Sequence, residues 1–241
     1  MNGELDKLSD WLLANKLSLN ETKTDLLIVR PKNTKYPEHL NIKINNHKLI
    51  PVTHVKYLGC IIDEHLTWNQ HVKQLIKKLS SAVGILSKLR HYANKKIYLN
   101  VYYAIFHSHI IYGSLVWQYT SNENLNALFA LQKRCIKLIN FSLPLDSPGP
   151  VFLSFEVLAL HDMLFLNNLK FIFSLFDNTM PLSLRYLYNT KSNITSELTC
   201  RFHYLLILPA VKTISYGLRS LRSEGASRWN QFSPHTVFSV T

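Results

Sequence analysis

Hydrophobic and polar positions predict one helix and several strands in the first quarter of the chain, and helices after it. Residues 4–16 repeat apolar side chains every three to four positions, which predicts an amphipathic helix. Short apolar or alternating runs then predict strands, at Thr24–Arg30, Asn41–Ile44, Lys48–Val52 and Val55–Ile62. Asn45-Asn46 separates the second strand from the third, and asparagine tolerates the positive φ of a hairpin turn.

After about residue 65 the period becomes helical. Residues 69–91 carry a regular apolar seam, formed by Val72, Leu75, Ile76, Leu79, Val83, Leu86 and Leu89. Asn94 is expected to cap a second helix, which extends to about Trp117 with an interruption near Gly113. The fold class expected from both parts is α+β: a small antiparallel sheet with a helix, followed by an all-α region.

Three further features organise the rest of the chain. Thr120-x-x-Glu123 predicts a capping box for a third helix that ends at about Asn140. Three prolines and a glycine in Leu143–Pro150 predict a boundary between domains. A long apolar helix is expected over about Leu160–Asp177, with short mixed elements in the last 50 residues, around Thr199–Leu208 and Tyr216–Trp229.

The charge is strongly positive and unevenly distributed. The net charge is +12, and residues 65–241 carry 18 Lys/Arg against 7 Asp/Glu, whereas residues 1–64 carry 9 against 8. Between Glu64 and Glu123 there is no acidic residue. Solvated surfaces usually mix both signs, so a long stretch of one sign favours an anionic partner such as nucleic acid.

The helix at 69–91 carries the most specific part of this charge. At 100° per residue, one face opposite the apolar seam collects lysines and small residues, namely Lys73, Lys77, Ser80, Ser81, Gly84 and Lys88. Small residues between lysines would let a phosphate backbone approach closely. The alternative is a solvated amphipathic helix whose lysines serve solubility, and the pattern leaves both interpretations open.

Other cations and aromatic residues lie near this helix in sequence. Lys95, Lys96 and His91 fall in the following connection, and Lys133, Arg134 and Lys137 in the third helix, so they extend a basic track or are separate surface charges. The aromatic side chains among them could stack on bases, although helical spacing favours the core for most: Tyr92, Tyr98, Tyr102, Tyr103, Tyr112 and Trp117.

Cysteine usage and hydropathy bear on the compartment. Cys60, Cys135 and Cys200 are odd in number and widely spaced, which favours reduced thiols and a nuclear or cytoplasmic location over a disulfide framework. The sequence contains no C-x-x-C pair, which is the usual sign of a zinc site. The apolar runs Val101–Trp117 and Met163–Phe176 are shorter than the roughly 20 residues of a spanning helix, so no membrane association is expected.

The sequence lacks the acids that a two-metal polymerase site needs. Such a site holds two Mg²⁺ ions about 4 Å apart with closely placed carboxylates. Asp63-Glu64 is the only adjacent acidic pair, and it is expected to open a turn. We therefore expect this chain to bind no metal cofactor and not to polymerise on its own.

Several motifs together resemble a known family. Leu8-Ser-Asp-Trp-Leu, Asn15-Lys-Leu-Ser-Leu-Asn with Lys23-Thr24, and the run Val55–Asp63 (VKYLGCIID) occur in the order found in the reverse transcriptase of jockey-type non-long-terminal-repeat retrotransposons. Further resemblance comes from Leu66-Thr-Trp68 with His71, and from four later segments: Ala104–Gly113 with Trp117, Leu131–Ile139, Leu158–Leu160 with Pro181, and Gly225–Asn230 (GASRWN).

The resemblance implies a division into three parts. Residues 1–66 correspond to the end of the palm with the primer-grip hairpin, residues 67–145 to the helical thumb, and residues 146–241 to the helical carboxyl-terminal region. The family's fingers, most of its palm and its catalytic aspartates have no counterpart here, so a truncated copy is expected. The parent enzyme is an RNA-directed DNA polymerase that uses Mg²⁺.

The same resemblance assigns roles and a partner. Lys23 matches an accessory proton donor, Tyr57, Leu58 and Gly59 match the primer grip, and the lysine face of residues 69–91 matches the part of the thumb that follows the duplex. The expected partner is an RNA/DNA primer–template duplex. Two alternatives remain open: a transposon remnant with no function of its own, and a basic helical module that binds an acidic partner.

Overall fold

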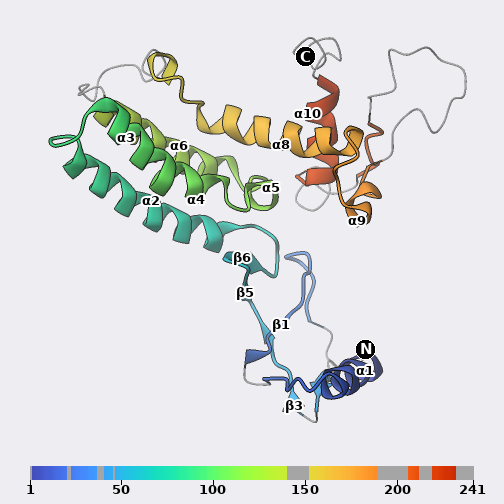
Figure 1. Cartoon of the computed structure of the whole chain (residues 1–241). Helices are drawn as coiled ribbons and strands as arrows, with labels where there is room; N and C mark the ends of the chain where they lie inside the picture. The colour runs from blue at the N-terminus through green and yellow to red at the C-terminus, as the bar shows by residue number, and fades with distance from the viewer. Residues whose placement is uncertain are drawn as a thin grey trace, which may run out of the picture. The chain divides into compact units, whose positions relative to one another are not determined.

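The computed structural model describes residues 2–20, 23–36, 41–45, 47–139, 152–188, 206–211 and 219–231 (Figure 1). The chain forms two compact units, Met1–His71 and Val72–Thr241. Of the described residues 58% are helical and 9% lie in strands, which confirms an α+β class dominated by helices. The boundary expected near residues 145–146 lies outside the described residues and stays a prediction.

Among its described residues, the first unit contains helix α1, the beginning of α2 and three two-stranded sheets. Helix α1 covers Asn2–Ala14, and the strands are β1 (Leu26–Leu27), β2 (Lys43–Ile44), β3 (His47–Lys48), β4 (Pro51–Val52), β5 (His54–Tyr57) and β6 (Cys60–Asp63). The pair β2–β3 is antiparallel, as the Asn45-Asn46 signal predicted. The pair β5–β6 is also antiparallel, whereas β1 pairs in parallel with β4. Asn45 begins the β2–β3 turn with φ 46°, which confirms its predicted role.

The core of the first unit is small. Ile42, Ile44 and Leu49 are buried, and Leu5, Leu19 and Leu26 pack against them. The predicted apolar face of α1 is only partly used, because Leu8 is 44% exposed and Trp11 58% exposed. Among the described residues, this cluster therefore buries few apolar side chains, and hydrophobic burial within it contributes little to the stability of the unit.

The second unit is helical, and α2 (Asn69–Leu89), whose first residues belong to the first unit, leads into it. It is followed by α3 (Lys95–Tyr102), the π-helical turn η2 (Tyr103–His107), α4 (Ser108–Ile111), α5 (Ser114–Trp117) and α6 (Asn122–Ile139). Asn94 caps α3 as predicted, since its side-chain oxygen accepts the Ile97 N–H at 3.0 Å. Gly113 interrupts the helix where expected, with φ 63°.

The N-terminus of α6 differs from the expected capping box. Ser121 Oγ accepts the Asn124 N–H at 3.4 Å, so Ser121 is the cap rather than Thr120. Thr120 Oγ1 instead accepts the side-chain amide of Asn124 at 2.8 Å. Thr120 and Ser121 both carry a hydroxyl, so the sequence left the position of the cap ambiguous by one residue, and the helix begins at Asn122, directly after Ser121.

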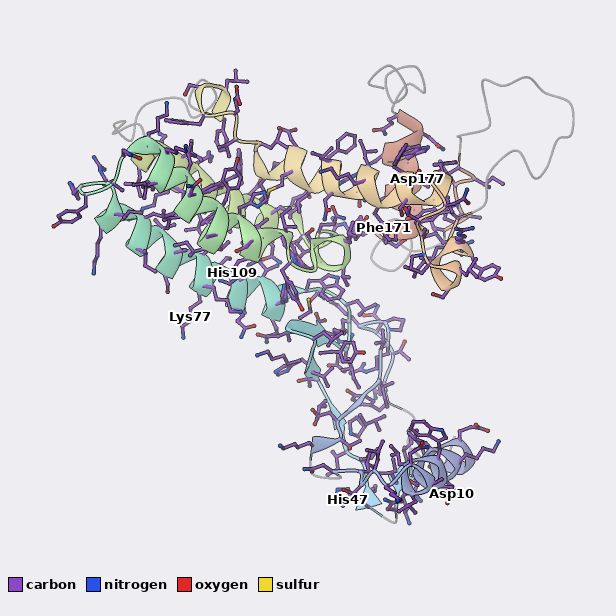
Figure 2. All side chains as sticks on the ribbon, viewed as in Figure 1. Asp10, His47, Lys77, His109, Phe171 and Asp177 are labelled. Carbon is purple, nitrogen blue, oxygen red and sulfur yellow. The ribbon has the colours of Figure 1, made fainter. Side chains whose placement is uncertain are left out.

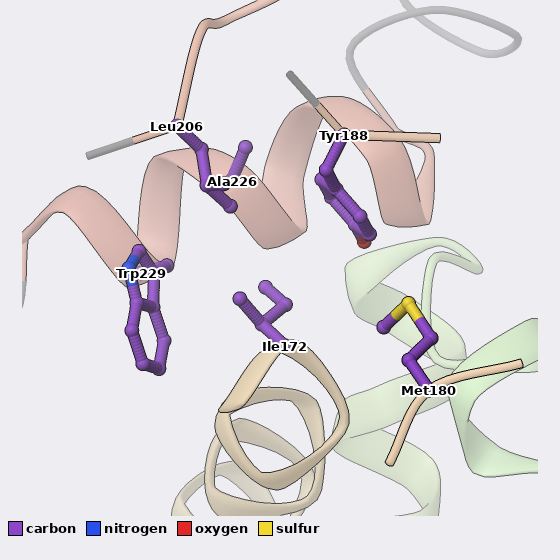
Figure 3. Packing of buried hydrophobic residues seen from close by; sticks show 6 residues of the cluster. All are labelled: Ile172, Met180, Tyr188, Leu206, Ala226 and Trp229. Atoms are coloured by element: carbon purple, nitrogen blue, oxygen red, sulfur yellow. The ribbon is translucent and has the colours of Figure 1, made fainter. Parts of the chain in front are cut away.

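The carboxyl-terminal helices form a second core. The elements are α8 (Leu160–Phe176), α9 (Leu182–Arg185), the π-helical turn η5 (Leu221–Gly225) and α10 (Ala226–Gln231). Ile172 of α8 lies at the centre of a buried cluster with Ala226 and Trp229 of α10, joined by Met180, Tyr188 and Leu206 (Figure 3). The Phe176 ring stacks on Trp229 with centroids 5.1 Å apart. The predicted helix at Leu160–Asp177 is thus confirmed, but only one side of it is buried, since Leu166 and Phe173 are exposed.

The GASRWN motif is explained by packing. A Cβ at Gly225 would lie 3.2 Å from Asn168 Oδ1 and 3.3 Å from Tyr188 Oη, so the position favours glycine. Asn230 accepts the Leu206 N–H at 2.9 Å and donates to the Leu206 carbonyl at 2.8 Å. These two bonds hold residue 206 against α10. Of the short element expected over Thr199–Leu208, the described residues include only 206–208, which are not helical.

Candidate nucleic-acid interface

The first candidate segment is the hairpin β5–β6. Alternation of side chains predicted a single strand over Val55–Ile62, and this was wrong, because the chain reverses at Leu58-Gly59. Both turn residues have positive φ, 45° for Leu58 and 82° for Gly59, as a two-residue hairpin turn requires. Leucine rarely adopts this conformation, at a cost of about 1–3 kcal/mol. Tyr57 and Leu58 are 63% and 73% exposed, so the hairpin presents an apolar tip.

A histidine anchors this hairpin to the beginning of α2. The Ile61 N–H donates to His71 Nδ1 at 3.3 Å, and His71 is buried. An accepting Nδ1 requires a ring nitrogen without a proton, so the neutral imidazole is the form that fits. The role of His71 is therefore to fix the hairpin relative to the first turn of α2.

The two adjacent acids of this unit both serve the fold. The Asp63 carboxylate accepts the backbone N–H groups of His65, Thr67 and Trp68 at 3.1, 3.0 and 2.8 Å, so it holds the loop that leads into α2. Glu64 Oε2 accepts the Tyr36 hydroxyl at 2.6 Å and pairs with Arg30 at 2.9 Å. Among the described residues, no three His, Cys, Asp or Glu side chains gather as a metal-binding group.

The Glu64 contacts predict a pH dependence. The Tyr36 hydrogen bond, followed by the Arg30 charge, lowers the pKa of Glu64. A lowered folded-state pKa stabilises the fold above the unfolded pKa of about 4.3, and this stabilisation is lost as the pH falls through the folded-state value. We expect urea midpoints of the first unit to fall below about pH 4.3. Glu64→Gln should flatten that fall, while Glu4→Gln on the exposed start of α1 should leave it unchanged; equal profiles for all three proteins would contradict the assignment.

Lys23, the residue matched to an accessory proton donor, lies in the first unit. Its side chain is exposed, and its backbone N–H donates to the Asn20 carbonyl at 3.1 Å. Among the described residues, no carboxylate lies within ion-pair distance of its ammonium group. Its position is compatible with a surface lysine at the edge of the β1 segment, and its proposed role stays a prediction.

The second candidate segment is the lysine face of α2, which lies in the second unit. Lys73, Lys77 and Lys88 are exposed, as are Ser80, Ser81 and Gly84 between them. The opposite seam is buried, with Val72, Leu79 and Leu86 0% exposed. Figure 2 shows Lys77 projecting outward from α2. The predicted division of α2 into an exposed lysine face and a buried apolar seam is therefore confirmed. Lys78, which the sequence reasoning omitted, is exposed as well.

Two observations make this face suited to an anionic partner. Within the described ranges, the ion pairs join Lys7 to Glu4, Arg30 and His65 to Glu64, and Arg228 to Glu224, and none involves a lysine of α2. A Cβ built on Gly84 would meet no heavy atom within 4 Å, so the helix backbone is open to close approach there. The lysines are thus left with solution counterions, which a phosphate backbone would displace.

The remaining predicted cations differ among themselves. Lys95 and Lys96 are both exposed, and Lys95 Nζ in addition lies 3.8 Å from the centroid of the Phe155 ring. Lys133 Nζ similarly lies 4.8 Å from the centroid of Phe129. Cation–π contacts of this kind tie lysines to the fold while leaving their charge in place. Lys95 is therefore partly structural, and Lys96 is free to face a ligand.

The aromatic residues divide into core and surface. Tyr98, Tyr102 and Trp117 are buried, as helical spacing predicted, and burial raises the pKa of Tyr98 and Tyr102. The Tyr98 hydroxyl donates to the Cys135 carbonyl at 3.2 Å, and the Tyr102 hydroxyl accepts from Gln132 at 3.0 Å. Of the six aromatic residues singled out near α2, Tyr92, Tyr103 and Tyr112 are exposed, at 89%, 42% and 57%, and are accessible for stacking on bases.

The described cysteines and the hydropathy of the helices do not point to a further functional site. Cys60 and Cys135 are free thiols, and burial raises the pKa of Cys135 to about 12, so it is unreactive at neutral pH. Cys200 lies outside the described residues. Among the helices that the structure describes, none is long and apolar enough to cross a membrane.

Comparison with known proteins identifies no relative: the chain matches no family model, no curated protein and no solved structure. Two separate segments are therefore candidates for binding on the basis of their structure alone. One is the apolar hairpin tip of the first unit, formed by Tyr57, Leu58 and Gly59. The other is the lysine face of α2 in the second unit, formed by Lys73, Lys77, Ser80, Ser81, Gly84 and Lys88.

Proposed function

We propose that the chain is a nucleic-acid-binding module that holds the backbone of an RNA/DNA primer–template duplex, as the thumb of the retrotransposon reverse transcriptases that it resembles would do. The observation that carries the proposal is the lysine face of α2, whose cations have no carboxylate partner among the described residues and flank an open glycine. Such a face fits a surface that follows phosphates and does not read bases.

The hairpin tip supports the same function in a different way. Tyr57 and Leu58 expose apolar surface on a turn whose Leu58 conformation is strained. Strain of this kind persists where surrounding structure enforces it, and it is common at ligand-contacting sites. A contact of Tyr57, Leu58 and Gly59 with the sugar edge of a primer strand is the role that we propose for it.

Binding to an RNA–DNA hybrid tests the proposal. We expect fluorescence anisotropy to give an affinity that falls steeply as salt increases, because binding releases counterions from the duplex. Lys73→Ala, Lys77→Ala and Lys88→Ala combined should weaken binding and flatten the plot of log affinity against log salt by about three units, roughly one per lost phosphate contact.

The matched control removes the same charge elsewhere. Lys32→Ala, Lys35→Ala and Lys48→Ala combined replace three exposed lysines of the first unit, so they test net charge alone. A slope equally flattened in both triple variants, or an unchanged slope in the α2 variant, would contradict the proposal.

Equal affinity for heparin, anionic vesicles and hybrids would favour the acidic-partner module, and a broad non-cooperative melt of the wild-type chain would favour the remnant.

Catalysis is a separate question with its own assay. The proposed function is binding, and the parent family's polymerisation uses carboxylates that we expect this chain to lack. Template-dependent nucleotide incorporation by the isolated chain with Mg²⁺ would overturn that expectation.

A further inference from the structure

The exposed side of α2 continues for one turn beyond the last residue of the helix. Helix α2 ends at Leu89, and the N–H of Tyr92 donates back to the Leu89 carbonyl at 3.0 Å. The N–H of His91 likewise donates to the Lys88 carbonyl at 3.4 Å. Bonds of this i−3 spacing form a tightened final turn. Tyr92 comes four residues after Lys88, so it lies on nearly the same side of the helix and about 6 Å further along its axis.

Tyr92 presents its ring to solvent more fully than any other large apolar side chain of the described residues. It is 89% exposed, whereas Tyr103 and Tyr112 are 42% and 57% exposed. Within the described ranges, none of the ring contacts or cation–π contacts involves Tyr92. Tyrosine usually packs the apolar body of its ring against the protein and leaves only the hydroxyl in water. The ring of Tyr92 therefore stays available to a partner.

Basic side chains flank Tyr92 along the chain, and acidic ones do not. No acidic residue occurs between Glu64 and Glu123, and the ion pairs of the described residues involve no lysine near Tyr92. An exposed ring among basic groups is the combination that single-stranded nucleic acids require, because the cations follow the phosphates while the ring stacks on a base. The exposed basic residues within four positions of Tyr92 are Lys88, His91, Lys95 and Lys96.

We infer that Tyr92 stacks on an unpaired base where one strand extends beyond the duplex, an inference that rests on the proposed function. The lysine face holds phosphates as far as Lys88, and the further 6 Å or so to Tyr92 is the length of about two stacked nucleotides. Inside a duplex the neighbouring pairs cover both faces of every base, so the ring requires a base without a partner. Stacking contacts the face of a base and tolerates any sequence. The ligand is therefore a hybrid with a single-stranded extension.

The test compares extensions that keep the phosphates but differ in the bases. RNA–DNA hybrids of one sequence are prepared blunt, with a few unpaired adenosines at a 5′ or a 3′ end, or with abasic nucleotides in the same places. Each is titrated with the full chain by anisotropy at fixed salt. We expect an adenosine extension to bind about tenfold more tightly than its abasic counterpart. Equal affinity of the adenosine and abasic extensions at both ends would overturn the inference and leave the proposed function intact.

Three variants locate the preference. Tyr92→Ala should abolish the advantage of the adenosine extension and leave the affinity for the blunt hybrid unchanged. Tyr92→Phe should keep the advantage, because stacking uses the ring and not the hydroxyl. Tyr186→Ala is the matched control, since Tyr186 is 84% exposed after α9 and its removal should keep the advantage as well. An equal loss of affinity for blunt and extended hybrids in Tyr92→Ala would overturn the inference, as would an advantage that Tyr92→Ala retains.

A last measurement separates the failure of the inference from that of the proposed function. If no hybrid binds at any salt, the proposed function is wrong, and a short single-stranded oligoadenylate is then titrated with the same proteins. Binding that Tyr92→Ala weakens about tenfold and Tyr186→Ala preserves would uphold Tyr92 as a site for unpaired bases. Absence of binding, or equal binding by both variants, would overturn it.

Discussion

Trp117→Ala is expected to lower the free energy of unfolding of the second unit by about 3–5 kcal/mol. Trp117 is 0% exposed at the end of α5, and its indole N–H donates to the Tyr112 carbonyl at 3.0 Å. Truncation would leave a large cavity and an acceptor without its donor, so both packing and hydrogen bonding are lost.

The measurement is a thermal melt followed by circular dichroism at 222 nm. A loss of this size corresponds to a fall in melting temperature of about 10 °C for a unit of this length. Trp117→Phe should cost less, because most of the buried ring is kept while the N–H is lost. Trp11→Ala is the matched control, since Trp11 is 58% exposed on α1 and its removal should matter little. Similar melting temperatures for both alanine variants would refute the assignment of Trp117 to the core.

The second large effect is expected for Asp63→Asn, which should destabilise the first unit by about 3 kcal/mol. The carboxylate accepts three backbone N–H groups and, at 3.2 Å, the Thr67 hydroxyl. The loop that it holds contains Leu66 with φ 48° and Trp68 with φ 63°. Neither side chain favours this conformation, so the loop depends on the carboxylate for its shape.

Trp68 provides the readout, because it is 7% exposed and its fluorescence should change as this loop opens. Urea titrations of the wild type and of Asp63→Asn are compared, with Asp10→Asn on the exposed side of α1 as the control. An asparagine keeps the shape but offers one acceptor oxygen in place of two. Coincident midpoints for Asp63→Asn and Asp10→Asn would show that the carboxylate does not hold the loop.

The helices could be predicted from the sequence because their signals are local. The seam of α2 repeats over about six turns, and the Asn94 cap lies within three residues of the N–H that it accepts. The β5–β6 hairpin was missed by the alternation of side chains for the opposite reason. Leu58 stands where asparagine or glycine normally marks a turn, so the local signal favours a continuous strand.

The parts that failed depend on contacts between distant residues. The pattern of α1 predicted an amphipathic helix, yet of its apolar residues Leu5 and Leu12 are half-buried while Leu8 and Trp11 are exposed. Patterning shows which side chains could be buried and does not show whether another element covers them. The lysine face could be predicted as a face, but its lack of carboxylate partners among the described residues becomes visible only in three dimensions.

The different surroundings of the lysines have a consequence for covalent modification. Acetylation neutralises a lysine and enlarges its side chain. At Lys73, Lys77 or Lys88 it would change the electrostatic potential of α2 and leave the helix packing untouched, because these side chains contact solvent. At Lys95 it would also break the cation–π contact with Phe155, so the contact between the beginning of α3 and the segment before α8 would loosen. Acetylation would thus change only the charge of α2, whereas at α3 it would also remove a packing contact.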